Sequence, residues 1–161
     1  MIVSNTSTLI LLAKASVLNI FLDTISGVLI PKIVHEEIKN KDSFEVLSIN
    51  NQIKKGKIKV LDIDKKYYEN IIREFKLDDG EAAVYALYKK ERGKLILTDD
   101  GELIKLCKIE QIPFTVAMAV VVKLYKKKKF VKAEALGKLE NLYGYGRYSE
   151  EIYQYFKSEV V

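Results

Sequence analysis

The sequence predicts an α/β fold built on a central, mainly parallel β-sheet of about five strands. Three observations predict it: short apolar runs recur along the chain, helix-length amphipathic segments separate them, and the connections between the two are short. A length of 161 residues with 48% hydrophobic residues is enough for one core. We therefore expect a single domain over residues 1–161.

The strand candidates are spread over the first three quarters of the chain. In order they are IVS at residue 2, GVLIP at 27, KIKVL at 57, KLILT at 94 and PFTV at 113. From Ala117 onward the pattern is helical, and Gly144 and Gly146 mark a turn before a last helix that begins near Ser149, a favoured N-cap type. We expect a core over about residues 1–125 and a C-terminal helical extension over about residues 126–161.

Composition limits the classes of function. The 27 Lys and Arg against 22 Asp and Glu give a net charge of +5, which favours a polyanionic partner without requiring one. The single cysteine, Cys107, cannot form an internal disulfide, and no leader precedes residue 2, so we expect a cytoplasmic protein. No apolar run approaches the ~20 residues of a membrane span. With one histidine, His35, a His/Cys zinc site is excluded.

Several acidic residues do not follow the surface pattern. In PKIVHEEIKN, helical geometry places Glu37 on the apolar face and Glu36 on the opposite face. In LDDGEAAVYALYKK, Glu81 shares a face with apolar residues and points to the interior. In LILTDDGEL, Asp99 and Asp100 stand at the carboxyl end of a buried strand.

Structural roles for these acids stay open. Asp78 and Glu81 fit a capping box, and either Asp99 or Asp100 could cap the helix that follows. Glu37 could be half exposed at the edge of its helix face.

The opening segment IVSNTSTLI raises the question of what Asn5 binds. A short strand ends in small polar residues, of which Ser4, Thr6 and Ser7 would orient Asn5 or a water molecule. The simpler interpretation is that Thr6 or Ser7 caps the next helix.

Asn5 and Asp100 both follow strands, and ligand sites in open α/β sheets form at the carboxyl ends of strands. Helices carrying Glu37 and Glu81 could frame the same place. Carboxylates that converge repel one another unless a cation lies between them, and oxygen-preferring Mg²⁺ or Mn²⁺ is the natural counter-ion. Such ions activate water and stabilise displacement at a phosphodiester, so the pattern indicates a nuclease.

The segments that carry these residues resemble the PIN-domain ribonucleases of the VapC-like toxin type, in a branch with a longer C-terminal helical tail. They are IVSNTSTLILLAKASVLNIF, GVLIPKIVHEEI, LDDGEAAVYALY and LILTDDGELIKLCKIEQIPFTV, in that order over about residues 1–125. YGRYSEEIYQYF matches the closing helix of that branch more loosely. The resemblance implies a PIN-like three-layer α/β/α fold.

The resemblance also implies a site. It would comprise Asn5, Glu37, Glu81 and Asp100 as metal ligands, with Asp99 as a second candidate for the last position. The implied activity is that of an endoribonuclease dependent on Mg²⁺ or Mn²⁺ and acting on RNA. Members of the group are often homodimers and are often inhibited by an antitoxin protein.

Asn5 departs from the usual aspartate of the group. An amide keeps a coordinating oxygen but removes a negative charge, so metal affinity should fall. The asparagine is tolerated, marks a silenced enzyme, or is an engineered change, and the sequence does not separate these. The alternative function is therefore a PIN-fold protein that binds RNA or a protein partner without cutting. An aspartyl-nucleophile phosphatase ranks last, because an amide cannot be that nucleophile.

Overall fold

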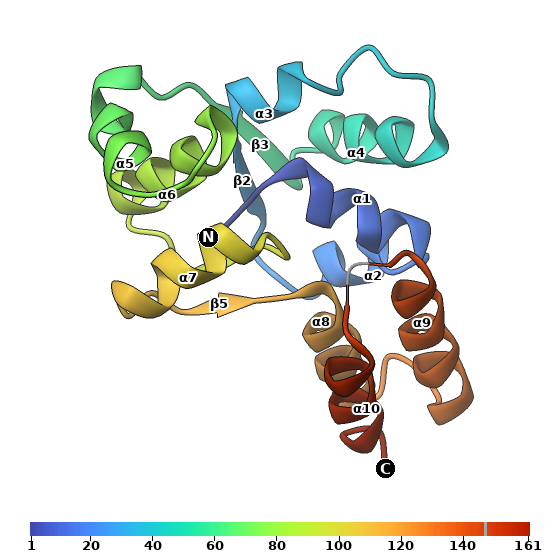
Figure 1. Cartoon of the computed structure of the whole chain (residues 1–161). Helices are drawn as coiled ribbons and strands as arrows, with labels where there is room; N and C mark the ends of the chain where they lie inside the picture. The colour runs from blue at the N-terminus through green and yellow to red at the C-terminus, as the bar shows by residue number, and fades with distance from the viewer. Residues whose placement is uncertain (147) are drawn as a thin grey trace.

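A five-stranded parallel sheet forms the centre of the molecule in the computed structural model, which describes residues 1–146 and 148–161 (Figure 1). Its strands lie in the order β3-β2-β1-β4-β5, and every neighbouring pair is parallel. The strands are β1 (Ile2–Ser4), β2 (Val28–Pro31), β3 (Ile58–Leu61), β4 (Leu95–Leu97) and β5 (Phe114–Thr115). Each lies within one of the five predicted runs, and the predicted parallel sheet is confirmed.

Helices connect the strands and cover both faces of the sheet, giving an α/β/α arrangement (Figure 1). They are α1 (Thr6–Lys14), α2 (Leu18–Asp23), α3 (Lys32–Glu36), α4 (Phe44–Lys54), α5 (Glu69–Glu74), α6 (Asp79–Glu91), α7 (Gly101–Ile109), α8 (Ala117–Lys126), α9 (Lys132–Gly144) and α10 (Glu150–Ser158), with a short 3₁₀ turn, η1 (Lys65–Tyr67), before α5. Across residues 1–146 and 148–161, each helix is too short or too polar to cross a membrane.

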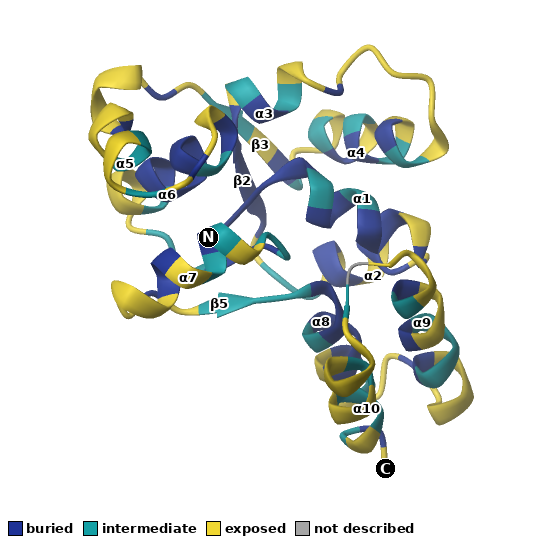
Figure 2. Ribbon diagram, in the orientation of Figure 1, coloured by how far each residue is buried: buried dark blue, intermediate teal, exposed yellow. Residues whose placement is uncertain are grey.

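The alternation of side chains along the strands divides the core into two clusters. Ile2 and Val28 point to the face covered by α1, α2, α4, α8 and α9, whereas Val3, Leu29 and Ile96 point to the face covered by α6 and α7. Figure 2 shows β2 buried between the inner sides of these helices, the edge strands β3 and β5 partly exposed, and the outer sides of the helices exposed. Burial on both faces explains why the inner strands β2 and β4 are continuously apolar, whereas the edge strand β3 carries the exposed Lys59.

The C-terminal extension packs as a helical group at one end of the molecule, where α9 lies against both α8 and α10 (Figure 1). The predicted cap of the last helix is confirmed, because Ser149 Oγ accepts a hydrogen bond from Ile152 N at 3.2 Å. Tyr143 of α9 stacks on Tyr153 of α10, with ring centroids 4.3 Å apart. These contacts hold the segment that also carries Tyr148, which reaches back to the sheet.

Candidate active site

The winding of the sheet reverses between β1 and β4, which are neighbours although more than ninety residues separate them in the chain. From β1 the chain continues outward through β2 and β3, and it then returns to β4 and β5 on the other side of β1. In open α/β sheets, ligands bind beyond the carboxyl ends of the strands at such a switch point. Asn5 follows β1 and Thr98 follows β4, so both lie at this position.

Asn5 links the end of β1 to the start of α1. It is 8% exposed and has an extended backbone (φ −88°, ψ 170°). Its Oδ1 accepts a hydrogen bond from Thr8 N at 3.1 Å, and its Nδ2 donates to Thr98 Oγ1 at 3.1 Å. The prediction that Thr6 or Ser7 caps α1 is therefore wrong: Asn5 is the last extended residue, and its side-chain oxygen is the one that reaches the N3 amide.

Thr98 joins the ends of β1 and β4 through side chains, although it was not among the residues predicted for the site. Its fully buried hydroxyl oxygen accepts from Asn5 Nδ2 and from Asp100 N, the latter at 3.1 Å. Asp99 N donates to Thr8 Oγ1 at 3.0 Å, and Ser4 Oγ donates to Leu97 O at 3.0 Å. The side chain of Asn5 is thus oriented by Thr98 and Thr8 N, whereas Ser4 Oγ donates to the backbone oxygen of Asn5 at 2.8 Å. A threonine directly before paired aspartates at a strand end is the only sequence signal for this role.

Asp78, Glu81 and Asp100 all serve as helix-capping residues. Asp78 Oδ1 accepts from Glu81 N at 2.8 Å and Glu81 Oε2 accepts from Asp78 N at 3.0 Å, which is the predicted capping box at the start of α6. Asp100 Oδ2 accepts from Leu103 N at 2.8 Å and caps α7. The caps fix these carboxylates at helix N-termini, where the helix dipole favours negative charge.

Glu81 and Asp100 are brought into direct contact by α6 and α7. Burial, the charges of Asp100 and Asp78, and a hydrogen bond with the Asp100 side chain raise the pKa of Glu81 to about 7, against a lowering effect of the hydrogen bond from Asp78 N. Two carboxyl groups in contact are stable only with a proton or a cation between them. Among the predicted site residues, Glu81 and Asp100 are therefore the pair that a bound cation would stabilise most.

Glu37 differs from the expectation that it points into the interior. Glu37 follows the last residue of α3 and keeps helical dihedrals (φ −65°, ψ −26°), but its side chain is exposed. It nevertheless lies beside the start of α6: a methyl group added to Gly80 would be 3.6 Å from Glu37 Oε1 and 3.0 Å from Val34 Cγ1. Partial burial and the charge of Asp78 raise the pKa of Glu37, whereas Lys41 lowers it.

Asp99 has a different environment from Asp100. It accepts a hydrogen bond from the hydroxyl of Tyr148, and its two carboxylate oxygens lie 3.4 Å and 3.3 Å from Ala117 N at the start of α8. Burial and the negative charge of Asp99 raise the pKa of Tyr148, which keeps that hydroxyl protonated as a donor. The carboxylate of Asp99 thus connects β4 to α8 and the C-terminal segment.

We expect replacement of Tyr148 by phenylalanine to destabilise the fold by about 1–2 kcal/mol, because it removes a donor from a half-buried carboxylate. Urea unfolding measures this difference. Tyr145→Phe is the matched control, since among the described residues the Tyr145 hydroxyl donates only to Lys14 O on the surface, and its effect should stay below about 0.5 kcal/mol. Equal effects of the two variants would contradict a structural role for the Tyr148 contact with Asp99.

The predicted metal ligands do not form an all-protein cage. Among the described residues, no three His, Cys, Asp or Glu side chains are grouped so that they could hold a metal ion. The residues present fit an ion that is bound by few protein ligands. Mg²⁺ is such an ion, because it usually keeps several waters and binds only one or two carboxylates. Glu81 and Asp100 supply that pair, and the Thr98 hydroxyl connects the backbone N of Asp100 to the amide of Asn5.

The fold and site together define an α/β protein with carboxylates in contact near the switch point of a parallel sheet. A family model described as a PIN domain, DUF3368, matches residues 1–160, and the chain belongs to this PIN-domain family. PIN domains are generally nucleases that act on RNA and use divalent metal ions. A search of curated proteins gave no match to the chain.

Proposed function

We propose that the protein is an endoribonuclease that depends on Mg²⁺ or Mn²⁺ and hydrolyses RNA phosphodiester bonds. The observation that carries the proposal is the contact between Glu81 and Asp100 near the carboxyl end of β4, with the pKa of Glu81 raised to about 7. A bound divalent ion would supply activation of water and neutralisation of the charge that develops on the phosphate. Membership of the PIN-domain family supports the same class of reaction.

The residues of the chain would have separate roles. Glu81 and Asp100 would hold the ion, and their helix caps would keep both carboxylates in place before RNA binds. Asn5 would add a neutral oxygen ligand, oriented by Thr98, and Glu37 would hold a second ion or a water molecule beside Asp78. Asp99 would fix the strand end through Tyr148 rather than bind metal.

The proposal includes a toxin–antitoxin role with a homodimeric, cytoplasmic protein and an antitoxin partner. Its support is the order and spacing of the four VapC-like segments and the family match over residues 1–160. The net charge of +5 supports a polyanionic substrate. Co-expression with the adjacent reading frame would test the antitoxin, and the mass in solution would test the dimer.

We expect the purified protein to cut single-stranded RNA with Mn²⁺ or Mg²⁺ and not with EDTA. The measurement is cleavage of a mixed panel of structured and single-stranded RNAs, each with Mn²⁺, Mg²⁺ or EDTA. Restoration of cleavage by adding metal after EDTA shows that the loss comes from the ion and not from unfolding. Cleavage that continues unchanged in EDTA would contradict a metal-dependent reaction.

The alternative is a silenced PIN-fold protein that binds RNA or a protein partner. The observation that favours it is Asn5, whose amide already makes one hydrogen bond through each of its polar atoms, to Thr8 N and Thr98 Oγ1. Such a protein would bind the same RNA panel equally with metal or EDTA and would leave it intact.

A further inference from the structure

We propose that a lysine-lined cavity on the sheet face covered by α2 and α8 binds a nucleotide-sized ligand through its phosphate group. The cavity has a volume of about 250 Å³. It lies where β1 and β4 begin, whereas the candidate active site lies where these strands end. The proposal therefore concerns a second site and does not rest on nuclease activity.

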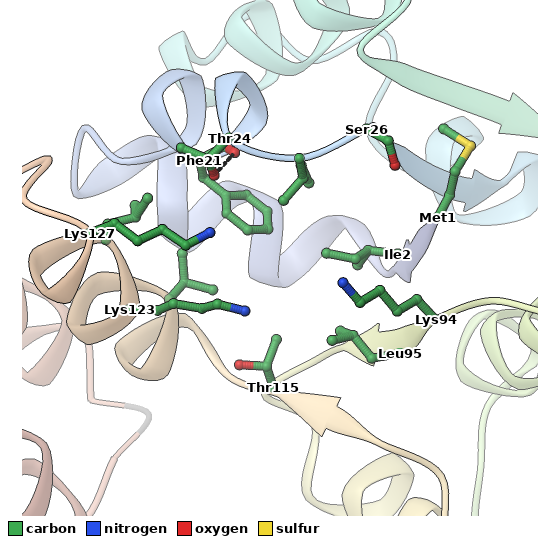
Figure 3. A pocket seen from close by; sticks show the side chains of 13 residues that line it. Met1, Ile2, Phe21, Thr24, Ser26, Lys94, Leu95, Thr115, Lys123 and Lys127 are labelled. Atoms are coloured by element: carbon green, nitrogen blue, oxygen red, sulfur yellow. Dashed lines mark hydrogen bonds between the residues drawn. The ribbon is translucent and has the colours of Figure 1, made fainter.

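Three lysines from two separate parts of the chain converge on this cavity. Figure 3 shows the ammonium groups of Lys94, Lys123 and Lys127 pointing toward the same space, from the start of β4 and from the end of α8. None of the described residues that line the cavity is acidic. Three positive charges without a carboxylate among them repel one another, and a bound anion would relieve that repulsion.

The pocket lysines also lack ion-pair partners elsewhere in the described part of the chain. The ion pairs there join Lys32 to Glu36, Lys57 to Asp23, Lys105 to Glu102 and Lys126 to Glu159. Asp23, which lies next to the cavity-lining Thr24 in sequence, thus pairs with Lys57 outside the cavity. The positive charge of the pocket is therefore available to a ligand, and a phosphate dianion matches it best.

The rest of the cavity is apolar. Phe21, Val120 and Leu124 are each at most 6% exposed and line it together with Ile2 and Leu95. An apolar wall gives inorganic phosphate nothing to contact, but it matches the face of a nucleobase.

Hydroxyl groups stand at the rim. Figure 3 shows Ser26 and Thr115 at the edge of the cavity, and Thr24 donates to Phe21 O at 2.8 Å. Hydroxyls beside lysines and an apolar wall are the groups that a ribose phosphate with its base requires. Two sources share this chemistry, a free mononucleotide and the 5′-phosphorylated end of an RNA strand.

Isothermal titration calorimetry in EDTA tests the proposal, because EDTA prevents phosphate from binding through a metal ion at Glu81 and Asp100. The probes are the four nucleoside monophosphates, the matching nucleosides, inorganic phosphate and a 5′-phosphorylated trinucleotide. We expect saturable binding of at least one monophosphate at one site per chain. It should weaken at higher salt, because the contacts are ionic and exposed.

Variants assign the binding to the pocket. The double substitution Lys94→Gln with Lys123→Gln should weaken binding about tenfold or more, because two charge-assisted contacts are lost. The charge-matched control, Lys55→Gln with Lys59→Gln, changes exposed lysines that do not line this cavity and should change binding less than about twofold. Thermal unfolding of both variants verifies that they remain folded.

Each outcome of the titration decides the proposal. No saturable binding, equal weakening by the control pair, or equal affinity for inorganic phosphate and nucleotides would overturn it. Tighter binding of the trinucleotide than of any monophosphate supports an RNA end as the ligand, and equal binding supports a free nucleotide. Because the readout is binding without metal, a failed titration leaves the proposed ribonuclease activity standing, and loss of cleavage leaves this pocket standing.

Discussion

Replacing Glu81 with glutamine is expected to lower the rate of RNA cleavage at least about 100-fold at saturating Mg²⁺ or Mn²⁺. Glutamine keeps the side-chain oxygen that accepts from Asp78 N, so the capping box and α6 remain in place. What is lost is the negative charge beside Asp100. The measurement is the initial rate of cleavage as a function of metal concentration.

Glu45→Gln is the matched control, because Glu45 also lies in the first turn of a helix, α4, but is not among the residues predicted for the site. Its cleavage rate should match that of the unchanged protein. If Glu81→Gln cuts RNA at the normal rate with the normal metal requirement, Glu81 is not part of the site, and the nuclease proposal loses the contact on which it depends.

Thermal unfolding gives the same variant a readout that does not depend on activity. The folded protein raises the pKa of Glu81 from 4.5 to about 7, so the fold favours the protonated form, and stability is lost as the pH rises from about 4.5 through 7. In EDTA at pH 8, Glu81→Gln should therefore raise Tm by no more than about 2–4 °C, because solvent screens this partly exposed pair. At pH 4.5 the difference should vanish, and Mn²⁺ should stabilise the unchanged protein more than the variant.

The strands could be predicted from sequence because burial on both faces of a sheet produces apolar runs, and polar or turn-forming residues separate one run from the next. Local polar contacts could also be predicted. The capping box at Asp78 and Glu81 and the Ser149 cap each join residues that are three apart in sequence. Glu37 was placed wrongly because a helical face does not determine burial at the end of a helix: Glu37 is the C-cap of α3, and its side chain is exposed there.

Contacts across long stretches of chain could not be predicted. The sequence left Asp99 and Asp100 as equivalent candidates, since both follow the same strand. They are separated by partners from other elements: Tyr148, 49 residues away, binds Asp99, whereas α6 brings Glu81 to Asp100. In the same way, only the pairing of β1 with β4 places Thr98 against Asn5.

Replacing Asn5 with aspartate is expected to lower the metal concentration needed for half-maximal cleavage about tenfold, because a carboxylate adds a charged ligand where an amide offers a neutral oxygen. Aspartate is as good an N-cap as asparagine, so the bond from Thr8 N survives. The Nδ2 donor to Thr98 is lost, but the Thr98 hydroxyl can rotate and donate to the new carboxylate. The fold should therefore tolerate the change.

The combination of Asn5→Asp with Glu81→Gln separates a metal effect from a general gain in activity. If Asn5 and Glu81 hold the same ion, their effects on metal affinity should be coupled, so the double variant should depart from the sum of the two single effects. Additive effects would place Asn5 outside the metal site. Cleavage by Asn5→Asp alone, with none by the unchanged protein, would mean that the amide silences the enzyme and that its role is RNA or protein binding. Cleavage by both, with the lower metal requirement in Asn5→Asp, would make the amide a working ligand of reduced affinity.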